Sequence, residues 1–148
     1  MKFVVLGLIL VILATTGCVT SVGRIADDPD SYSGQVMKIK GEAGKGFTIP
    51  LTEIYVFLLK GKEASVPVVA MNKADQGSIV VIEGTVWAFP EEGMNAGSIE
   101  AVDAVQAFLI DHELVSEKRA RDASALVLTA VGKLAAGLGN IWFVIEAQ

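Results

Sequence analysis

Cys18 is the only cysteine of the 148-residue chain and carries its most reactive side chain. A thiolate can act as a nucleophile, bind a metal ion or form a disulfide, and a lone cysteine excludes a disulfide within the chain. Cys18 follows three small residues at 15–17 and an unbroken apolar run from Phe3 to Ala14, with Lys2 in front. These are the three parts of an export signal, and the run is too short to span a bilayer.

The stretch "TTGC" at 15–18 resembles the lipobox of bacterial lipoproteins, with Thr15 where Leu is more common. The resemblance implies cleavage between Gly17 and Cys18, diacylglycerol on the Cys18 thiol, and an acyl chain such as palmitate on the new N-terminus. Several acyl chains together hold a protein firmly on a bilayer. We therefore expect a membrane-anchored protein of the bacterial cell envelope. By the same resemblance, Val19 rather than Asp after the lipidated cysteine permits sorting to the outer membrane of a bacterium with two membranes, where we expect the protein on the periplasmic face.

The alternative is a standard signal peptide followed by a free or structural cysteine. Loss of membrane association in Cys18→Ser would distinguish the two.

Asp111, His112 and Glu113 bring the only histidine of the chain together with carboxylates. Three consecutive residues cannot converge on one metal ion from a helix, and in a strand only Asp111 and Glu113 share a face. A single histidine leaves no His-rich ligand set and no usual Ser–His or Cys–His pair. We expect a solvated surface here, and a protein that is not an enzyme and has no metal and no cofactor. A hydrolytic or metal enzyme using these residues is the weakest alternative.

Two further segments resemble sites only superficially. In "GEAGKG" at 41–46, a phosphate-binding loop would need Gly in place of Ile39 and Ser or Thr in place of Gly46. We expect a strongly bent strand or a turn there. The acidic "DDPD" at 27–30 offers oxygen ligands but lacks the EF-hand spacing and its glycine, so we expect a turn.

Four aromatic residues occupy alternate positions of two expected strands: Tyr55, Phe57, Trp87 and Phe89. Exposed on a barrel, they would form a stacking platform for bases or sugars. A small barrel also needs large side chains in its core, and this interpretation is favoured. Trp87 and Phe89 share a face with polar residues, so they are the better candidates for facing a ligand.

The charge of the chain argues against a nucleic-acid partner. Twelve basic and 17 acidic side chains give a net charge of −5, and removal of Lys2 with the signal leaves 11 − 17 = −6. Phosphates need neutralisation by Lys or Arg, which an acidic protein does not supply. A local basic excess lies in the expected barrel, at Lys38, Lys40, Lys45, Lys60 and Lys62. We expect these lysines to be solvated and to protect strand edges.

The alternation of side chains predicts two strands in the first half of the chain. "DDPDSYSG" at 27–34 is typical of a turn, and polar and apolar residues alternate from Gln35, which indicates a half-buried strand. "TEIYVFLLKG" is apolar on both faces and rich in β-formers, so we expect a more central strand.

Two more strands follow. "ASVPVVAM" contains Pro67, which favours an edge position or a bulge because proline cannot donate to the ladder. "SIVVIEGTVWAFP" contains Gly84, which indicates a bend or bulge.

Two motifs resemble the signatures of small bacterial OB-fold domains. "DPDSYSGQVMKIKGEAG" contains a P-x-x-Y-x-G turn before strand one, and "QGSIVVIEGTVWAF" follows the glycine-valine pattern of strand four. The resemblance covers residues 25–90 and implies a five-stranded barrel. The loops "NKADQG" and "KGKEAS" depart from the family pattern, which affects the ligand-facing loops more than the barrel.

The closing strand has two candidates, "AVQAFLIDHEL" and the C-terminal "IWFVIEAQ", the latter with 92–140 as an insertion. Between them, 116–138 is predicted to be a helix with Ser116 as N-cap, ended by Gly139–Asn140. Its apolar stripe consists of Ala123, Val127, Ala130, Leu134 and Leu138. Because an apolar β-rich run follows the helix, we favour the C-terminal strand.

The predicted helix is rich in small residues, and Gly132 and Ala136 lie four apart, which allows another helix to approach closely. Lys133 disfavours a membrane span. We expect the helix to pack on the barrel or on a second copy.

These observations predict a signal peptide at 1–17, a lipidated tether at 18–24, and a mainly β, OB-fold-like five-stranded barrel with an added C-terminal helix at 25–148. We expect a non-catalytic binding or interaction module. Besides the bilayer, its partner would be an envelope protein or a second copy. The alternative function is binding of a small ligand or oligosaccharide through Trp87 and Phe89.

Overall fold

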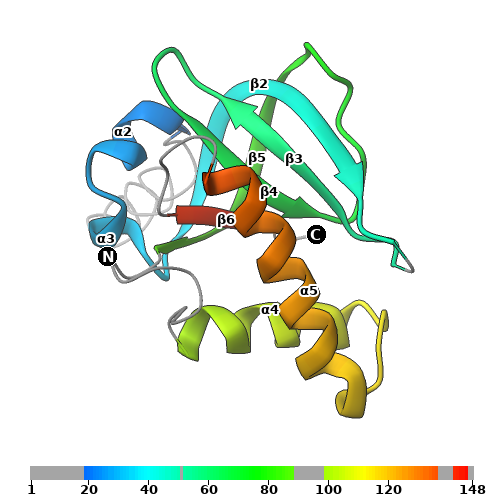
Figure 1. The fold of residues 1–148 in the computed structure, drawn as a ribbon. Coiled ribbons are helices and arrows are strands. Elements are labelled where there is room, and N and C mark those ends of the chain that lie inside the picture. Colours follow the sequence, from blue (N-terminus) through cyan, green and yellow to red (C-terminus); the bar gives the residue numbers. More distant parts are fainter. Residues whose placement is uncertain (1–18, 51, 89–98, 137–141, 147–148) are drawn as a thin grey trace, which may run out of the picture.

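The computed structural model describes residues 19–50, 52–88, 99–136 and 142–146 (Figure 1). Five strands form a closed barrel: β2 (Val36–Thr48), β3 (Tyr55–Lys60), β4 (Ser65–Ala70), β5 (Ile79–Ala88) and β6 (Trp142–Glu146). Their order is β2-β3-β4-β6-β5, and the pairing of β2 with β5 completes the circle. All neighbours are antiparallel except β4 and β6. The predicted OB-fold-like barrel with an added C-terminal helix is confirmed.

Strand β2 serves both halves of the barrel because it bends at its glycine-rich segment. Its first half, Val36–Glu42, pairs with β5, and its second half continues against β3 as far as Thr48. The register with β3 shifts between Ala43 and Gly46. A shift of this kind bends a strand and increases its twist. The prediction of a bent first strand at 41–46 is therefore confirmed.

The prediction for Pro67 was wrong, and of the two alternatives for Gly84, a bend or a bulge, the bulge is excluded. Pro67 does not lie in an edge strand, since β4 lies between β3 and β6; it pairs with Leu58, and the pairs with β6 begin only at Val68. Gly84 marks no bulge, because β5 keeps a continuous register with β2 through it. Glycine is needed there for close approach: a Cβ on Gly84 would lie 2.5 Å from the carbonyl oxygen of Ile145.

The C-terminal part forms two helices and the last barrel strand. "AVQAFLIDHEL" is largely helical, within α4 (Ile99–Asp111), so its assignment as a strand is excluded. The helix predicted at 116–138 is α5 (Glu117–Ala136). Leu138 and Gly139–Asn140 lie outside the described residues. Strand β6 closes the barrel, parallel to β4 and antiparallel to β5. The favoured C-terminal strand is thus confirmed.

Helices α4 and α5 form a hairpin, in which α5 lies across one outer side of the barrel and α4 packs against α5 below the barrel (Figure 1). Because outward side chains alternate with inward ones along a strand, this side presents its own apolar set. Val56, Val69, Phe143 and Ile145 are buried there against Val127 and other residues of the helices. Helix α5 therefore packs on this chain, as one of the two sequence-based alternatives expected. Of the helices described, none has the length and apolar character to span a membrane.

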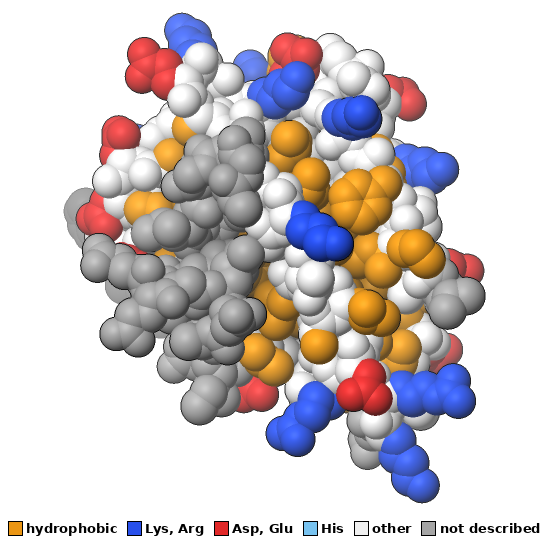
Figure 2. All heavy atoms as spheres, in the orientation of Figure 1, with side chains coloured by type: hydrophobic (Ala, Val, Ile, Leu, Met, Phe, Trp, Pro, Cys, Tyr) orange, Lys and Arg blue, Asp and Glu red, His pale blue; other side chains and the backbone are white. Residues whose placement is uncertain are grey.

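The side chains that point inward form a separate core. It is built from residues of all five barrel strands, among them Ile39, Phe57, Val68, Val86 and Trp142. The hairpin side of the molecule shows patches of hydrophobic side chains beside α5, with charged side chains around the rim (Figure 2).

The N-terminal residues differ from the predicted tether. Val19–Ser21 form strand β1, parallel to β2, and Val22–Asp27 form helix α2, capped by the Ser21 hydroxyl, which accepts from the Arg24 N–H at 3.3 Å. Val22 and Ile25 are completely buried in the barrel core. The tether prediction therefore does not hold for residues 19–24, because two large side chains of α2 complete the core.

Helix α2 is followed by the short helix α3 (Pro29–Tyr32). Gly34, with φ 82°, then reverses the chain into β2, as the turn at 27–34 predicted.

Candidate functional site

Strand β1 fixes the start of the folded domain directly beside the cysteine. Cys18 and Gly17 lie outside the described residues, so their predicted lipidation and cleavage stay predictions. Val19, the next residue, is paired with Lys38 of β2. Because consecutive Cα atoms are about 3.8 Å apart, any group on Cys18 is held next to this strand.

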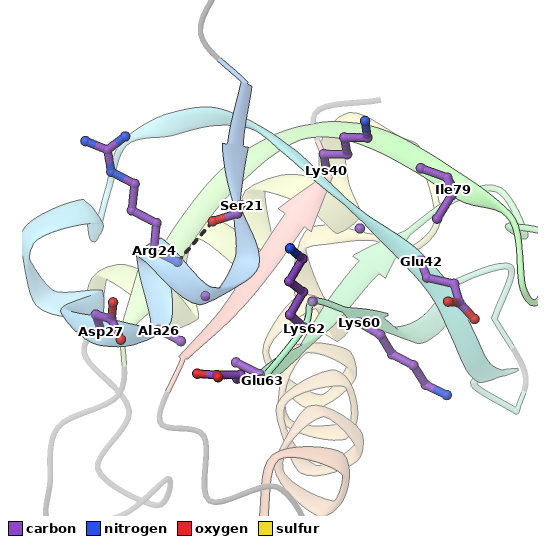
Figure 3. A pocket seen from close by; sticks show the side chains of 14 residues that line it. Ser21, Arg24, Ala26, Asp27, Lys40, Glu42, Lys60, Lys62, Glu63 and Ile79 are labelled. Atoms are coloured by element: carbon purple, nitrogen blue, oxygen red, sulfur yellow. Dashed lines mark hydrogen bonds between the residues drawn. The ribbon is translucent and has the colours of Figure 1, made fainter.

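An open groove of about 1120 Å³ lies beside the end of β1 (Figure 3). Its walls come from β1 and α2, from the middle of β2, and from the turn Gly61–Ala64 that joins β3 to β4. The Gly61 N–H donates to the Ala64 carbonyl at 2.7 Å and closes this turn. Helix α2 contacts the turn closely, since a Cβ on Gly61 would lie 3.0 Å from Cβ of Val22.

The charge of the groove is opposite in sign to that of the chain. It is lined by four basic residues, Arg24, Lys40, Lys60 and Lys62, and by three acidic residues, Asp27, Glu42 and Glu63. The net charge is +1, in a chain whose net charge is −5. In Figure 3, Lys62 points toward β1 and β2, whereas Arg24 extends away from the centre of the groove.

Three of the five lysines singled out in the sequence meet at this groove, and Lys45 and Lys38 do not line it. Arg24 was missed because residues 18–24 were assigned to a tether. The signal that could have found α2 is the capping residue Ser21 followed by Val22 and Ile25 at helical spacing.

The aromatic residues do not form an exposed platform in the described part of the chain. Trp87 points outward as its alternation predicted, but it is half-buried and packs against the core under the helical hairpin. Its indole N–H is buried without a hydrogen-bond partner among the described residues. Phe89 lies outside the described residues.

The other two aromatics belong to the barrel core. Phe57 is 1% exposed, and Tyr55 stacks on it with ring centroids 5.8 Å apart. The core interpretation is confirmed for this pair.

Asp111, His112 and Glu113 lie at the C-terminal end of α4. The His112 ring lies 4.5 Å from the Phe108 ring, and its Nδ1 is 2.9 Å from the Phe108 carbonyl oxygen. Asp111 and Glu113 are exposed, and Glu113 ends the helix with φ 55°. Over residues 19–136 and 142–146, as far as these are described, no three His, Cys, Asp or Glu side chains are placed to share a metal ion. The cluster ends a helix and holds the His112 ring against it.

Of the acidic residues at 27–30, Asp28 has a local role. The Ser31 hydroxyl donates to the Asp28 carboxylate, and the Asp28 N–H donates to the Ile25 carbonyl at 3.1 Å. These bonds join the end of α2 to α3, as expected of a turn.

Among the titratable side chains that the structure describes, the Glu146 carboxyl at the end of β6 has a clearly shifted pKa. Partial burial raises the pKa of this carboxyl above its ordinary value, because desolvation disfavours the charged form. It pairs with Gly84 of β5 and lies away from the groove, so it bears on stability and not on the candidate site.

No protein-family model matches the chain, and no curated protein is significantly similar to it.

Proposed function

We propose that the chain is a bacterial envelope lipoprotein, anchored by acyl chains on Cys18, whose barrel is a non-catalytic binding or interaction module. The observation that carries this proposal is the resemblance of "TTGC" at 15–18 to a lipobox, behind a positively charged residue and a short apolar run. In a bacterium with two membranes the anchored barrel lies on the periplasmic face of the outer membrane.

The position of the fold relative to Cys18 supports the anchor. The first described residue, Val19, already belongs to a strand, and the apolar run ends four residues before Cys18. Removal of residues 1–17 thus leaves every described element intact. A cut inside α2 would instead remove Val22 from the core.

The anchored protein offers the groove beside β1 as its interaction surface. Its four basic residues suit a partner with acidic groups at this point, and the partner class we propose is a second envelope protein. A stacking platform at Trp87 receives less support, because the indole is half-buried under the helical hairpin.

The anchor is tested by comparing the wild-type chain with Cys18→Ser in a bacterial host, using membrane fractionation and mass spectrometry of the mature N-terminus. We expect the wild type to start at Cys18 with the added mass of acyl chains. We expect Cys18→Ser to lose the lipid and its membrane association. A Cys18→Ser chain that is cleaved at the same bond and stays in the membrane would overturn the proposal.

The interaction module is tested by photo-crosslinking in living cells. A crosslinking residue at Lys62 samples the groove, and the same residue at Leu126, 57% exposed on α5, is the matched control. We expect a defined envelope protein to be captured from position 62 and not from position 126. Equal capture from both positions would contradict a role for the groove.

A further inference from the structure

We propose that the outward side of β1, β2 and β5 lies flat on the bilayer that holds the acyl chains of Cys18; this inference rests on the proposed lipid anchor. The surface is called the anchor face below. It comprises the outward side chains of β1, of the first half of β2, and of the first half of β5.

The anchor face follows from the strand register. Val19 pairs with Lys38, and Val36, Lys40 and Glu42 of β2 pair with Thr85, Val81 and Ile79 of β5. Directly paired residues in neighbouring strands point to the same side of a sheet. The aliphatic side chains on this side are strongly exposed, at 49% for Val19, 62% for Val36, 53% for Val81 and 64% for Ile79.

The anchor lies at the edge of this face. Cys18 is bonded to Val19, and neighbouring strands are about 5 Å apart, so Val36 lies within about 10 Å of Val19. A flexible tether would let a domain move freely above the bilayer. Here Val22 and Ile25 hold β1 and α2 on the barrel, so the strand that follows Cys18 and the face belong to one folded unit.

The charges around the face fit a headgroup region. The groove opens onto it, since Ser21, Lys40 and Ile79 on three adjacent strands belong to both (Figure 3). Lys40, which lies on the border between groove and face, can contact lipid phosphates, whereas Arg24 on α2 and Lys62 on the β3–β4 turn are left for the protein partner of the groove. Glu42 and Glu83 also lie on this side, so the aliphatic side chains, and not net charge, provide most of the contact.

The acyl chains change how strong this contact must be. Scattered exposed aliphatics are common on soluble proteins and need no partner. An anchor holds the face at the bilayer, so that even a weak contact becomes effectively intramolecular. Exposed aliphatics beside basic side chains then enter the headgroup boundary to a depth of about 5–10 Å.

The experiment uses the lipidated chain in vesicles of phosphatidylethanolamine and phosphatidylglycerol. An acylated Cys18 has no free thiol, so Val81→Cys introduces the only reactive cysteine and can carry a nitrobenzoxadiazole fluorophore. Leu126→Cys on α5 is the matched control, because the two wild-type side chains are similarly exposed. With spin-labelled lipid in the headgroup region, we expect quenching at 81 to exceed that at 126 by about threefold or more.

Each outcome decides the inference. Equal quenching at 81 and 126 on a chain whose Cys18 is acylated, as checked by mass spectrometry, overturns the docking and leaves the lipid anchor intact. An unmodified Cys18 overturns both. Shielding of the fluorophore in detergent micelles that rises with protein concentration shows that a second copy covers the face, and it overturns the docking as well.

A second variant separates docking from folding. Val36→Asp places a charge on an exposed position of the anchor face, where only a small shift of the unfolding midpoint is expected from the lower strand propensity of Asp. In the chain labelled at 81, it should reduce the quenching to the level at 126, while the protein still floats with the vesicles. Persistent strong quenching in this variant would contradict contact through the face.

Discussion

The two outer sides of the barrel carry similar side chains but meet different surroundings. On the side of β3, β4 and β6, the outward residues Val56, Val69 and Phe143 are completely buried under α4 and α5. On the side of β1, β2 and β5, the outward residues Val36 and Val81 are more than half exposed. The chain thus covers one apolar side with its own helices and leaves the other one open.

The difference shows that the burial of an outward side chain depends on the helices packed over the barrel as much as on the strand that carries it. Both sides have the same alternation, because every barrel strand has one inward and one outward set. The hairpin that covers one side is inserted between β5 and β6. The open side is the one that begins with Val19, next to the proposed anchor.

The largest effect is expected from a matched pair of truncations. Phe143→Ala removes a fully buried ring between the barrel and the hairpin, and we expect the free energy of unfolding to fall by about 3–5 kcal/mol. Val81→Ala removes a side chain on the open side and should change it by less than about 0.5 kcal/mol. Urea unfolding of both variants measures the contrast, and similar losses would show that the open side is also covered.

The second effect concerns helix α2, whose Val22 and Ile25 side chains complete the barrel core. Ile25→Ala deletes a fully buried side chain of α2, and we expect a loss of about 2–4 kcal/mol in the free energy of unfolding. The neighbouring Arg24→Ala, on the exposed side of the same helix, is the control and should cost little. Equal stability of the Ile25→Ala variant and the wild type would restore residues 19–24 to the status of a tether.

The third effect tests the junction between the two sides, where β5 meets β6. Gly84→Ala forces a Cβ to within 2.5 Å of the Ile145 carbonyl oxygen, and overpacking of this kind costs about 1–3 kcal/mol. Gly23→Ala in α2 has nothing within 4 Å of the new Cβ and should be neutral or slightly stabilising. If thermal unfolding gave the two variants the same midpoint, the close approach of β6 to Gly84 would be refuted.

Much of the barrel could be predicted from the sequence, because strand alternation and glycine positions are local signals. The four barrel strands β2 to β5, the bend at 41–46 and the helix α5 follow from residues close together in the chain. The C-terminal strand could be favoured but not fixed, since its pairing with β4 depends on contacts across more than seventy residues. The close approach at Gly84 was missed for the same reason, because its neighbour Ile145 is remote in sequence.

The surroundings of candidate site residues were less accessible to sequence analysis. Alternation placed Trp87 on the outer side correctly, yet nothing local indicates that a helical hairpin would cover it. Likewise the three lysines of the groove come together only when β2 and the β3–β4 turn are placed beside α2. Residues 19–24 were misjudged because the proximity of Cys18 favoured a tether over the helix signal at Ser21.

The smallest effect depends on pH and compares Glu146, on the inward side of β6, with an exposed carboxyl of the open side. Burial raises the pKa of Glu146 in the folded chain above its value in the unfolded chain, so the folded state binds more protons in the interval between the two pKa values. Stability therefore falls as the pH rises through this interval, and the full loss is present at neutral pH. Glu146→Gln removes the ionisation and should raise the thermal midpoint by about 1–2 °C at neutral pH. At a pH of about 3.5, where most glutamates of both states are protonated, we expect much less gain.

The exposed Glu42 of the open side provides the control for this measurement. Glu42→Gln keeps an exposed position polar and should leave the difference between the two pH values unchanged. A Glu146→Gln gain of equal size at both pH values would mean that packing of the amide, and not desolvation of the carboxylate, causes the effect. Glu146 would then behave like a neutral residue at the end of the barrel interior, and the raised pKa would have no part in the stability of β6.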